Sequence, residues 1–410
     1  MSQNEKMSQQ FQLPKGWRWL KLKDVIREFV NGGTPNTNIP QFWNGGIPWI
    51  TSADIKNLYV SKGRKYISQE GLYNSSTHLV KKDTVLIATR TGVGKVAIAE
   101  NDLCFSQDIT GVVCTDEIFP EFLARYLLSQ GDNLIRIQRG ATIKGLTRED
   151  IESLFIPLPA FAEQRRIAAK IQELMQDVDR ARAACKKQLE AAKVLPTAYL
   201  REVFESKEAK NWEKKKLGEV CIINPSRPKN FTRAPNELTT FIPMAAVDGR
   251  TGTVAKSEVV PYLKVSKGYT YFEENDVLFA KITPCMQNGK HVIVRNLIDG
   301  IGFGTTEFHV LRPGKEILPG WIWYFVRRAC FLHEATTYFS GAVGQQRVPK
   351  DFLANYSIPC PPLSVQKYLV AGLNEKTAGL EKIYMAAKKQ LDIINVFPQK
   401  ILNRAFKGEL

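Results

Sequence analysis

Apolar residues recur at helical spacing in two long stretches of the chain. In the first stretch they step by four and three along Ile167, Ile171, Leu174, Val178, Ala181, Cys185, Leu189 and Ala192. The same steps return 202 positions later at Leu369, Leu373, Lys376, Leu380, Ile383, Ala387, Leu391 and Ile394, where only Lys376 is not apolar. A heptad seam of this length, flanked by charged residues, predicts a coiled coil.

Prolines mark the expected limits of these helices. Pro159 and Pro361 precede them, and Pro196 and Pro398 are expected to close the regular stretch. About 36 residues at ~1.5 Å each predict a rod of roughly 54 Å. A single helix of this kind would usually be a core-packing helix. Two matching seams favour an antiparallel pair instead, because the chain must return through the segment between them.

The segment before each long helix mixes strand and helix patterns. "DTVLIAT" (83–89) and "ITGVVC" (109–114) are typical of strands, whereas "FPEFLARYLLSQ" (119–130) and "LPGWIWYFVRRA" (318–329) are typical of helices. Each such segment is therefore predicted to be a globular α/β domain.

The globular segments are repeats of each other. Trp17 matches Trp212, Pro48 matches Pro243, and "GK" recurs at 94–95 and 289–290. A unit of roughly 200 residues is far longer than a solenoid repeat and indicates two domains. We predict an α+β fold with a pseudo-two-fold internal repeat, in which two α/β domains are separated by two long antiparallel helices forming a coiled coil. The predicted segments are 1–158 and 211–360, globular, and 159–210 and 361–410, helical.

The composition and net charge of the chain indicate the class of partner that it binds. The 410 residues carry a net charge of +16, with a pI near 9.4, which indicates a polyanionic partner. Nucleic acid is the first candidate and an anionic membrane surface the second. No window approaches 18 consecutive apolar residues, so no membrane span is expected. Seven scattered cysteines without CxxC and four isolated histidines favour a reducing cytoplasm, without disulfides or a metal site.

Catalytic motifs fail on inspection. "TRTGVGKVA" (89–97) resembles a phosphate loop, but Val96 stands where Ser or Thr should hold magnesium. "INPSRP" (223–228) faintly resembles the Asn-Pro-Pro-aromatic loop of amino-methyltransferases, but Ser226 and Arg227 break the pattern. The sequence therefore predicts no cofactor and no enzymatic activity of its own.

Basic and amide side chains in turn-rich parts of both globular segments are the candidate DNA contacts. Matched lysines suit phosphate, and forked side chains suit base edges, although about half of such residues are usually only solvated. The candidates are Arg64, Arg90, Lys95, Arg139, Lys144, Lys281, Gln287, Lys290, Gln345 and Arg347.

Four segments give the chain a family resemblance. "GGTPNTNIPQFWNGGIPWITSADI" (32–55), "IPLPAFAEQRRIAAKI" (156–171), its weaker copy "IPCPPLSVQKYLV" (358–370) and "ILNRAFKGEL" (401–410) resemble the specificity subunits of type I restriction–modification enzymes. The resemblance implies two target-recognition domains, each reading one half of a bipartite site in double-stranded DNA. It also implies helices that set the spacing of the half-sites and dock two modification subunits, which carry adenine methyltransferase activity.

The resemblance extends to further partners and contacts. It implies an ATP-using restriction subunit as an additional partner, and partner-binding residues at Gln164, Arg165, Gln366 and Lys367. The middles of the two globular segments align poorly, so we expect different half-sites. One rival interpretation is a self-contained DNA methyltransferase, which would need the missing cofactor loop. The other is a bivalent architectural DNA-binding protein that works without catalytic partners.

Overall fold

The computed structural model describes residues 13–138, 145–342 and 346–410. Its packing divides the chain into two compact units. Unit 1 comprises residues 1–184 and 390–410, and unit 2 comprises residues 185–389. Each unit contains one of the repeated globular segments together with one end of each long helix. We describe the two units separately.

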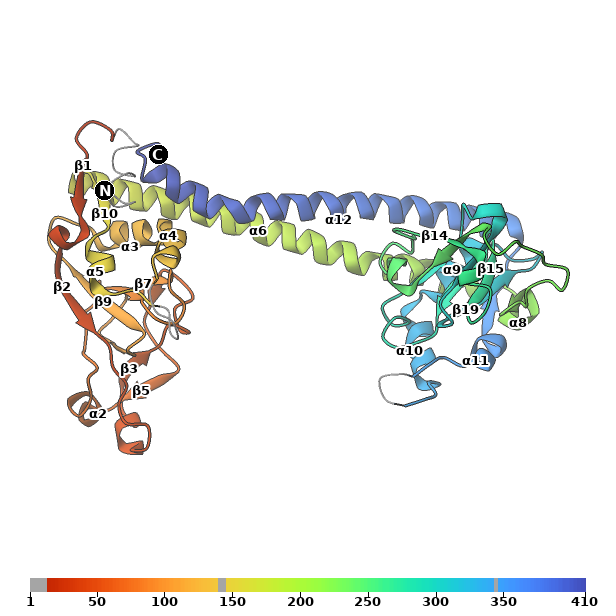
Figure 1. The fold of residues 1–410 in the computed structure, drawn as a ribbon, viewed down its shortest axis with the longest axis horizontal. Coiled ribbons are helices and arrows are strands. Elements are labelled where there is room, and N and C mark those ends of the chain that lie inside the picture. The colour runs from red at the N-terminus through yellow and green to blue at the C-terminus, as the bar shows by residue number, and fades with distance from the viewer. Residues whose placement is uncertain (1–12, 139–144, 343–345) are drawn as a thin grey trace. The chain divides into compact units, whose positions relative to one another are not determined.

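Unit 1 is built on two sheets (Figure 1). A five-stranded sheet has the order β2 (Ile26–Asn31), β9 (Ile109–Cys114), β6 (Val85–Ala88), β7 (Val96–Ala99) and β4 (Tyr59–Val60). A smaller sheet orders β5 (Lys65–Ile67), β3 (Ile47–Ile50) and β8 (Cys104–Phe105). All four residues of β6 are buried, which explains why this strand is a continuous apolar run.

Helices and one strand pair complete unit 1. Helix α3 (Pro120–Ser129), with Pro120 in its first turn, packs on β6 and β7. It is followed by α4 (Gly131–Arg136) and α5 (Arg148–Glu152). The remaining elements are β1 (Arg18–Lys21), paired with β10 (Phe155–Leu158), and the short helices η1 (Leu22–Val25), η2 (Pro40–Trp43) and α2 (Gln69–Tyr73).

Unit 2 repeats this plan with two four-stranded sheets. One orders β12 (Cys221–Ile223), β19 (Phe308–Pro313), β16 (Val277–Ala280) and β17 (His291–Ile293). The other orders β14 (Glu258–Pro261), β13 (Leu238–Ile242), β18 (Ile301–Gly304) and β15 (Thr270–Glu273). Strand β16, like β6, is buried at every position.

Helix α9 (Pro319–Val326) packs on β16 and β17 of unit 2 as α3 packs on its sheet in unit 1. The strand pair of β11 (Lys214–Lys216) and β20 (Ser357–Pro359) repeats the pair of β1 and β10. The other helices are α7 (Lys207–Lys210), α8 (Leu217–Val220), η3 (Met244–Ala246), η4 (Tyr262–Lys264), η5 (Ile298–Gly300), α10 (Ala329–Thr337) and α11 (Lys350–Asn355). The predicted fold class, α+β with two repeated domains, is confirmed.

The two long helices run further than predicted. Helix α6 (Phe161–Phe204) has 44 residues and α12 (Leu363–Ala405) has 43, so each continues through the proline that was expected to end it. Proline removes one backbone hydrogen bond. Residues beyond it, Phe204 in unit 2 and Leu402 in unit 1, are buried in the unit cores. This packing outweighs the lost bond, so the prediction at Pro196 and Pro398 was wrong.

The predicted seam is correct at every seventh residue and shifted at some positions between. Buried positions spaced seven residues apart run through both helices and are Ile171, Val178, Cys185, Ala192, Leu373, Leu380, Ala387 and Ile394. Ala181, Lys376 and Ile383 are exposed, whereas the next residue in each case, Arg182, Thr377 and Tyr384, is half-buried. The second position of the heptad lies four residues after the first, which is one residue beyond the predicted place at 181, 376 and 383 and agrees with the prediction at Leu189 and Leu391.

Polar contacts give the direction of the helices within each unit. In unit 1, Arg182 donates from Nε to Asn395 Oδ1 at 3.2 Å, and Arg166 donates to the Leu410 carbonyl at 2.7 Å. In unit 2, Lys376 pairs with Glu202 at 3.0 Å. The start of one helix thus lies beside the end of the other in each unit, which is antiparallel packing. The coiled coil itself stays a prediction.

Candidate nucleic-acid interface

In both units the loop after the fully buried strand makes the same backbone joint. In unit 1, Thr89 N donates to Asp108 O at 2.8 Å, and Thr89 O accepts from Leu146 N at 2.7 Å. In unit 2, Lys281 N donates to Glu307 O at 2.9 Å, and Lys281 O accepts from Val348 N at 3.0 Å. The joint is made by main-chain atoms, so it is retained although the side chains differ.

Four segments meet around each joint, and together we call them the loop cluster of that unit. In unit 1 the segments are 51–54, 89–95, 106–108 and 145–147; in unit 2 they are 244–251, 281–290, 305–307 and 346–348. Most of the predicted DNA contacts lie in these clusters. The turns that carry these basic residues follow the buried strands β6 and β16, and their contact with DNA stays a prediction.

The predicted residues of unit 1 differ in whether other groups of the protein bind their charged side chains. Arg90 is exposed, and no carboxylate in the described part of unit 1 pairs with its guanidinium. Lys95 donates from Nζ to Ser52 O at 3.0 Å. Arg64 lies outside the cluster's segments but pairs with Asp54 inside it, at 2.8 Å. Arg139 and Lys144 lie outside the described residues.

The Arg64 pair is embedded in a turn. Asp54 also accepts hydrogen bonds from the backbone and hydroxyl of Thr51, at 2.9 and 2.8 Å. Burial opposes ionisation of this carboxyl group, yet the hydrogen bonds from Thr51 and Arg64 leave its pKa below the usual value. Asp54 is therefore ionised at neutral pH and holds Arg64, 73% of whose side chain is exposed, at the edge of the cluster.

The predicted residues of unit 2 are mostly paired with other protein groups. Arg347 forms a forked ion pair with Glu307, with two N–O distances of 2.8 Å. Hydrogen bonding from Arg347, supported by the charges of Arg347 and Lys281, lowers the pKa of Glu307. Lys290 donates from Nζ to Met244 O and Val247 O at 2.9 and 3.0 Å. Gln287 is exposed, and its Oε1 accepts from the Thr283 hydroxyl at 2.8 Å; Gln345 lies outside the described residues.

Comparison with known proteins decides the family. The family model for the type I restriction modification DNA specificity domain matches residues 14–191 and again residues 209–384. The chain belongs to this family. The two matches coincide with the two repeated segments and so account for the internal duplication. The predicted resemblance to specificity subunits is confirmed.

Individual relatives agree with this assignment. The chain is 37% identical over 160 residues to the type I restriction enzyme EcoEI specificity subunit of Escherichia coli, covering 39% of this chain and 26% of the relative. It therefore spans about a quarter of that relative's length. A chain from a structural study of complex assembly and conformational transition in the type I R-M system has TM-score 0.74 at 23% identity, covering 98% and 100%. The HsdS subunit from Thermoanaerobacter tengcongensis has TM-score 0.66 at 22% identity, covering 98% and 99%; both likenesses concern the fold.

Two of the residues predicted to bind partners in this specificity-family chain are buried. Gln164 and Gln366 have no exposed surface. Gln164 accepts from Phe119 N and donates to Glu117 O and Pro159 O, at 2.8–3.0 Å. Gln366 repeats this set with Leu318 N, Glu316 O and Pro361 O, at 2.8–3.0 Å.

This burial corrects the prediction for the two glutamines. Each amide satisfies three main-chain groups where a long helix leaves its globular segment, so it joins the helix to the domain inside the chain. Arg165 and Lys367, the neighbours of these glutamines, are exposed, and their role stays a prediction.

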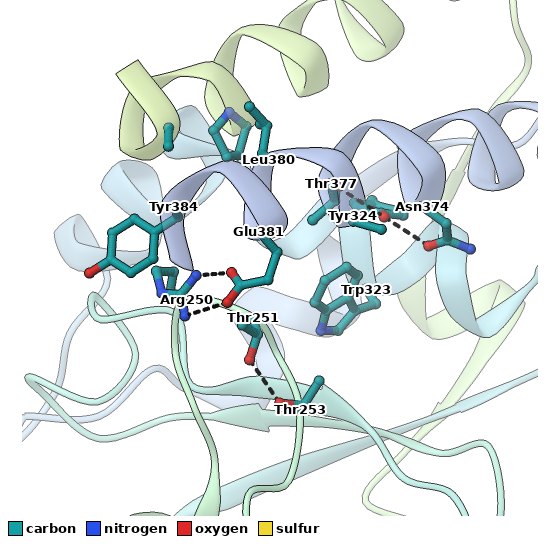
Figure 2. A pocket seen from close by; sticks show the side chains of 13 residues that line it. Arg250, Thr251, Thr253, Trp323, Tyr324, Asn374, Thr377, Leu380, Glu381 and Tyr384 are labelled. Carbon is teal, nitrogen blue, oxygen red and sulfur yellow. Dashed lines mark hydrogen bonds and ion pairs between the residues drawn. The ribbon is translucent and has the colours of Figure 1, made fainter. Parts of the chain in front are cut away.

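A cavity of about 320 Å³ in unit 2 joins its loop cluster to the long helices (Figure 2). Arg250 makes a forked ion pair with Glu381 of α12, with one N–O distance of 2.9 Å. The guanidinium also lies 4.2 Å from the centre of the Tyr384 ring. Tyr324 donates its hydroxyl to Asn374 Oδ1 at 2.8 Å on the other side of the cavity. No local sequence pattern indicated Arg250, because Glu381 lies 131 positions away.

Two absences hold for the described part of this specificity-family chain. No helix in it has the length and apolar character that a bilayer crossing requires. Within the same residues, His, Cys, Asp and Glu side chains nowhere gather in a set of three or more that could hold a metal ion.

Proposed function

We propose that this chain is the DNA-recognition subunit of a type I restriction–modification complex. It reads an asymmetric bipartite site in double-stranded DNA, and each unit's loop cluster reads one half. It docks two modification subunits, and restriction subunits are a further partner. Methyl transfer and cleavage belong to these partners, so the chain itself is not an enzyme and needs no cofactor. It acts in the cytoplasm, where host DNA lies.

The observation that carries this proposal is the duplicated loop cluster within a duplicated specificity domain. Both clusters are built on the same main-chain joint, so two readers of one kind stand on one chain. Their side chains differ at the joint itself, where Thr89 and Asp108 of unit 1 correspond to Lys281 and Glu307 of unit 2. Because base identity is read by side chains, two clusters with different side chains support two different half-sites.

Electrostatics support a DNA partner. The net charge of +16 favours association with phosphate, and exposed cations such as Arg64 and Arg90 lie in or beside the loop cluster of unit 1. The relatives are named as specificity subunits of restriction enzymes, and one solved neighbour comes from a study of complex assembly in the type I R-M system. These names support modification and restriction subunits as partners.

The decisive experiment is methylome sequencing of host cells with and without the gene for this chain, in the presence of its modification subunit. We expect adenine methylation at one asymmetric bipartite motif, and its complete loss when the chain is absent. We also expect the purified chain alone to transfer no methyl group. Methylation that persists without the chain, or a palindromic motif, would show that this chain does not select the target as proposed.

A further inference from the structure

We propose that Lys95 and Lys290 are positioning residues, which hold the loop that reads DNA in shape by binding its main chain and do not contact phosphate. This inference rests on the proposed function and deepens it. It replaces the sequence-based expectation that the matched lysines are phosphate contacts. The evidence is one contact that occurs in both units.

In unit 1 the contact fixes both sides of one residue. Lys95 Nζ donates to Ser52 O at 3.0 Å, and Ser52 N donates to Asp108 Oδ2 at 3.1 Å. Ser52 is 3% exposed. Its backbone is therefore held by a cation on its carbonyl and an anion on its amide, within the turn whose Asp54 carboxylate pairs with Arg64.

In unit 2 the same contact is stronger. Lys290 Nζ donates to Met244 O and Val247 O at 2.9 and 3.0 Å, and Val247 is 1% exposed. Arg327 adds three bonds, to Gly289 O, Gly249 O and Arg250 O, at 2.7–2.9 Å. Segment 244–250 is thus held by two cations through four main-chain carbonyls.

The two contacts are equivalent in the repeat. Ser52 lies four residues after Pro48, and Val247 lies four residues after the matching Pro243. Lys95 and Lys290 are the lysines of the matching Gly-Lys pairs. The same lysine therefore reaches the same carbonyl in each unit. A lysine that served only to contact phosphate would not need to bind a main-chain carbonyl at the same repeat position in both units.

The chemistry of the ammonium group favours a positioning role. Lysine offers three N–H donors, and in unit 2 two of them are used by carbonyl oxygens. Hydrogen bonds from a charged donor are roughly twice as strong as neutral ones, so the loop gains much of its definition from this one side chain. Beyond the anchored residues, "ADIKN" and "DGRTG" share little sequence. A fixed anchor below a variable loop is the arrangement that lets one fold read different bases.

The test uses the chain assembled with its modification subunits. Lys290→Met removes the charge and the donors but keeps most of the length of the side chain. Binding is measured on DNA with the full site and on DNA with one half-site scrambled, across a series of salt concentrations. We expect affinity for the full site to fall about tenfold or more, as when one base pair is misread. Affinity for scrambled DNA and the slope of log K against log salt should stay unchanged.

Matched variants make the result specific. Lys95→Met should act in the same way on the half-site read by unit 1, with a smaller loss because it breaks one bond to a carbonyl where Lys290→Met breaks two. It also decides the question if Lys290→Met fails to fold. Arg90→Met removes an exposed cation of the same loop cluster as Lys95; a slope smaller by about 0.9 with equal weakening on all DNA would mark Arg90 as a phosphate contact and gives the pattern against which the lysine variants are judged.

A phosphate-type result for the lysine variants, meaning a slope lowered by about 0.9 and equal weakening of full and scrambled sites, would overturn the inference. Failure of the proposed function is distinguishable, because the unchanged complex would then show no preference between full and scrambled DNA. A loss of preference confined to one half-site for each lysine supports the inference and assigns each unit its half-site.

Discussion

The loop clusters of the two units share one main-chain joint and one anchoring lysine, but the second anchoring group differs. In unit 1 the anchor is one ammonium and one carboxylate, from Lys95 and Asp108. In unit 2 it is two cations, Lys290 and Arg327, bound to main-chain carbonyls. The position of Arg327 is taken by Leu128 in the repeat of unit 1, counted from the matching Pro120 and Pro319. The duplicated fold therefore keeps its backbone contacts, while the groups that shape each loop diverge.

In both units, an aromatic residue from the end of a long helix completes the hydrophobic core. In unit 1, Phe406, which directly follows α12, has its ring centre 5.1 Å from those of both Phe122 and Tyr126. In unit 2, Phe204 at the end of α6 lies 4.5 Å from the Trp321 ring. Phe204 and Phe406 are 202 positions apart, which is also the separation of Gln164 and Gln366. Cores are thus conserved between the repeats, and the loops above them are not.

The largest expected effect comes from truncating the centre of one core. Trp321→Ala should lower the free energy of unfolding of unit 2 by about 3–5 kcal/mol, and Phe122→Ala should do the same for unit 1. We expect Trp321→Ala near the upper end, because Trp321 Nε1 also donates to Pro359 O at 2.8 Å. Hydrogen exchange of the amides in β16 and β6 measures each unit separately.

Tyr73→Ala is the matched control, because Tyr73 is an aromatic residue of unit 1 that is 84% exposed. It should leave exchange in both strands unchanged. Equal loss of protection in both units after either core substitution would contradict the comparison, since it would mean that the two cores do not unfold independently.

The next largest effect is expected at acidic pH, where unit 2 should lose more stability than unit 1. The His309 ring in unit 2 donates from Nε2 to Val348 O at 2.8 Å and accepts from Asn224 Nδ2 at 2.9 Å, an arrangement that requires the neutral ring. Burial lowers the pKa of His309 from 6.5 to about 4. Burial likewise lowers the pKa of His291, which is fully buried in the same unit, well below its ordinary value.

The sign of the effect follows from proton binding. Between about pH 6.5 and pH 4 the unfolded chain binds a proton at His309 and the folded unit does not, so the free energy of unfolding falls as the pH falls through this window. The full loss from this residue is about 3 kcal/mol. Unit 1 has no buried histidine among its described residues, so it lacks this source of pH dependence.

Exchange of β16 and β6 amides between pH 6.5 and 4.5, corrected for intrinsic rates, checks this prediction. His309→Gln, which takes up no proton in this range, should flatten the pH dependence of unit 2 in part and leave the share due to His291. A pH dependence of equal size in both units would show that residues other than the buried histidines dominate.

Much of the fold was predictable because hydrophobic periodicity and repetition are properties of the sequence itself. The buried strands β6 and β16 are continuous apolar runs, and the long helices show their seam every seven residues. The ends of the helices were not predictable from local rules. Pro196 indicates a helix end by its chemistry, but the burial of Phe204 in unit 2 decides otherwise, and burial depends on tertiary packing.

For the candidate site, the sequence indicated which turns carry basic residues and did not indicate what those residues contact inside the chain. Basic residues marked the turns that meet around each joint, but the partners of Lys95 and Lys290 are main-chain carbonyls, which carry no side-chain signature. Gln164 and Gln366 attracted notice as polar residues in a repeated motif, and their burial shows that a motif can be repeated for the sake of the fold. One signal for this was available, because the two glutamines stand at the same place in both copies whereas their neighbours differ.

The smallest expected effect concerns Arg250, which ties the loop cluster of unit 2 to α12 (Figure 2). Side-chain exposure of 38% for Arg250 and 34% for Glu381 places this pair near the surface, where ion pairs contribute about 0–1 kcal/mol. The contact with Tyr384 adds roughly 0.5–1 kcal/mol. Arg250→Ala should therefore speed exchange of the amides in 248–253 several-fold and leave the amides of β16 unchanged.

Arg180→Ala is the control for Arg250→Ala, because Arg180 pairs with Asp177 on the surface of α6 and touches no loop cluster. It should change neither set of amides. Lys290 and Arg327 hold the same segment of unit 2 independently of Arg250, so the half-site preference of the complex should survive Arg250→Ala and be lost in Lys290→Met. If Arg250→Ala also abolished the preference, the tie to α12 would belong to the anchor. The difference between the units would then lie in the attachment of a loop to a helix as well as in the cations beneath the loop.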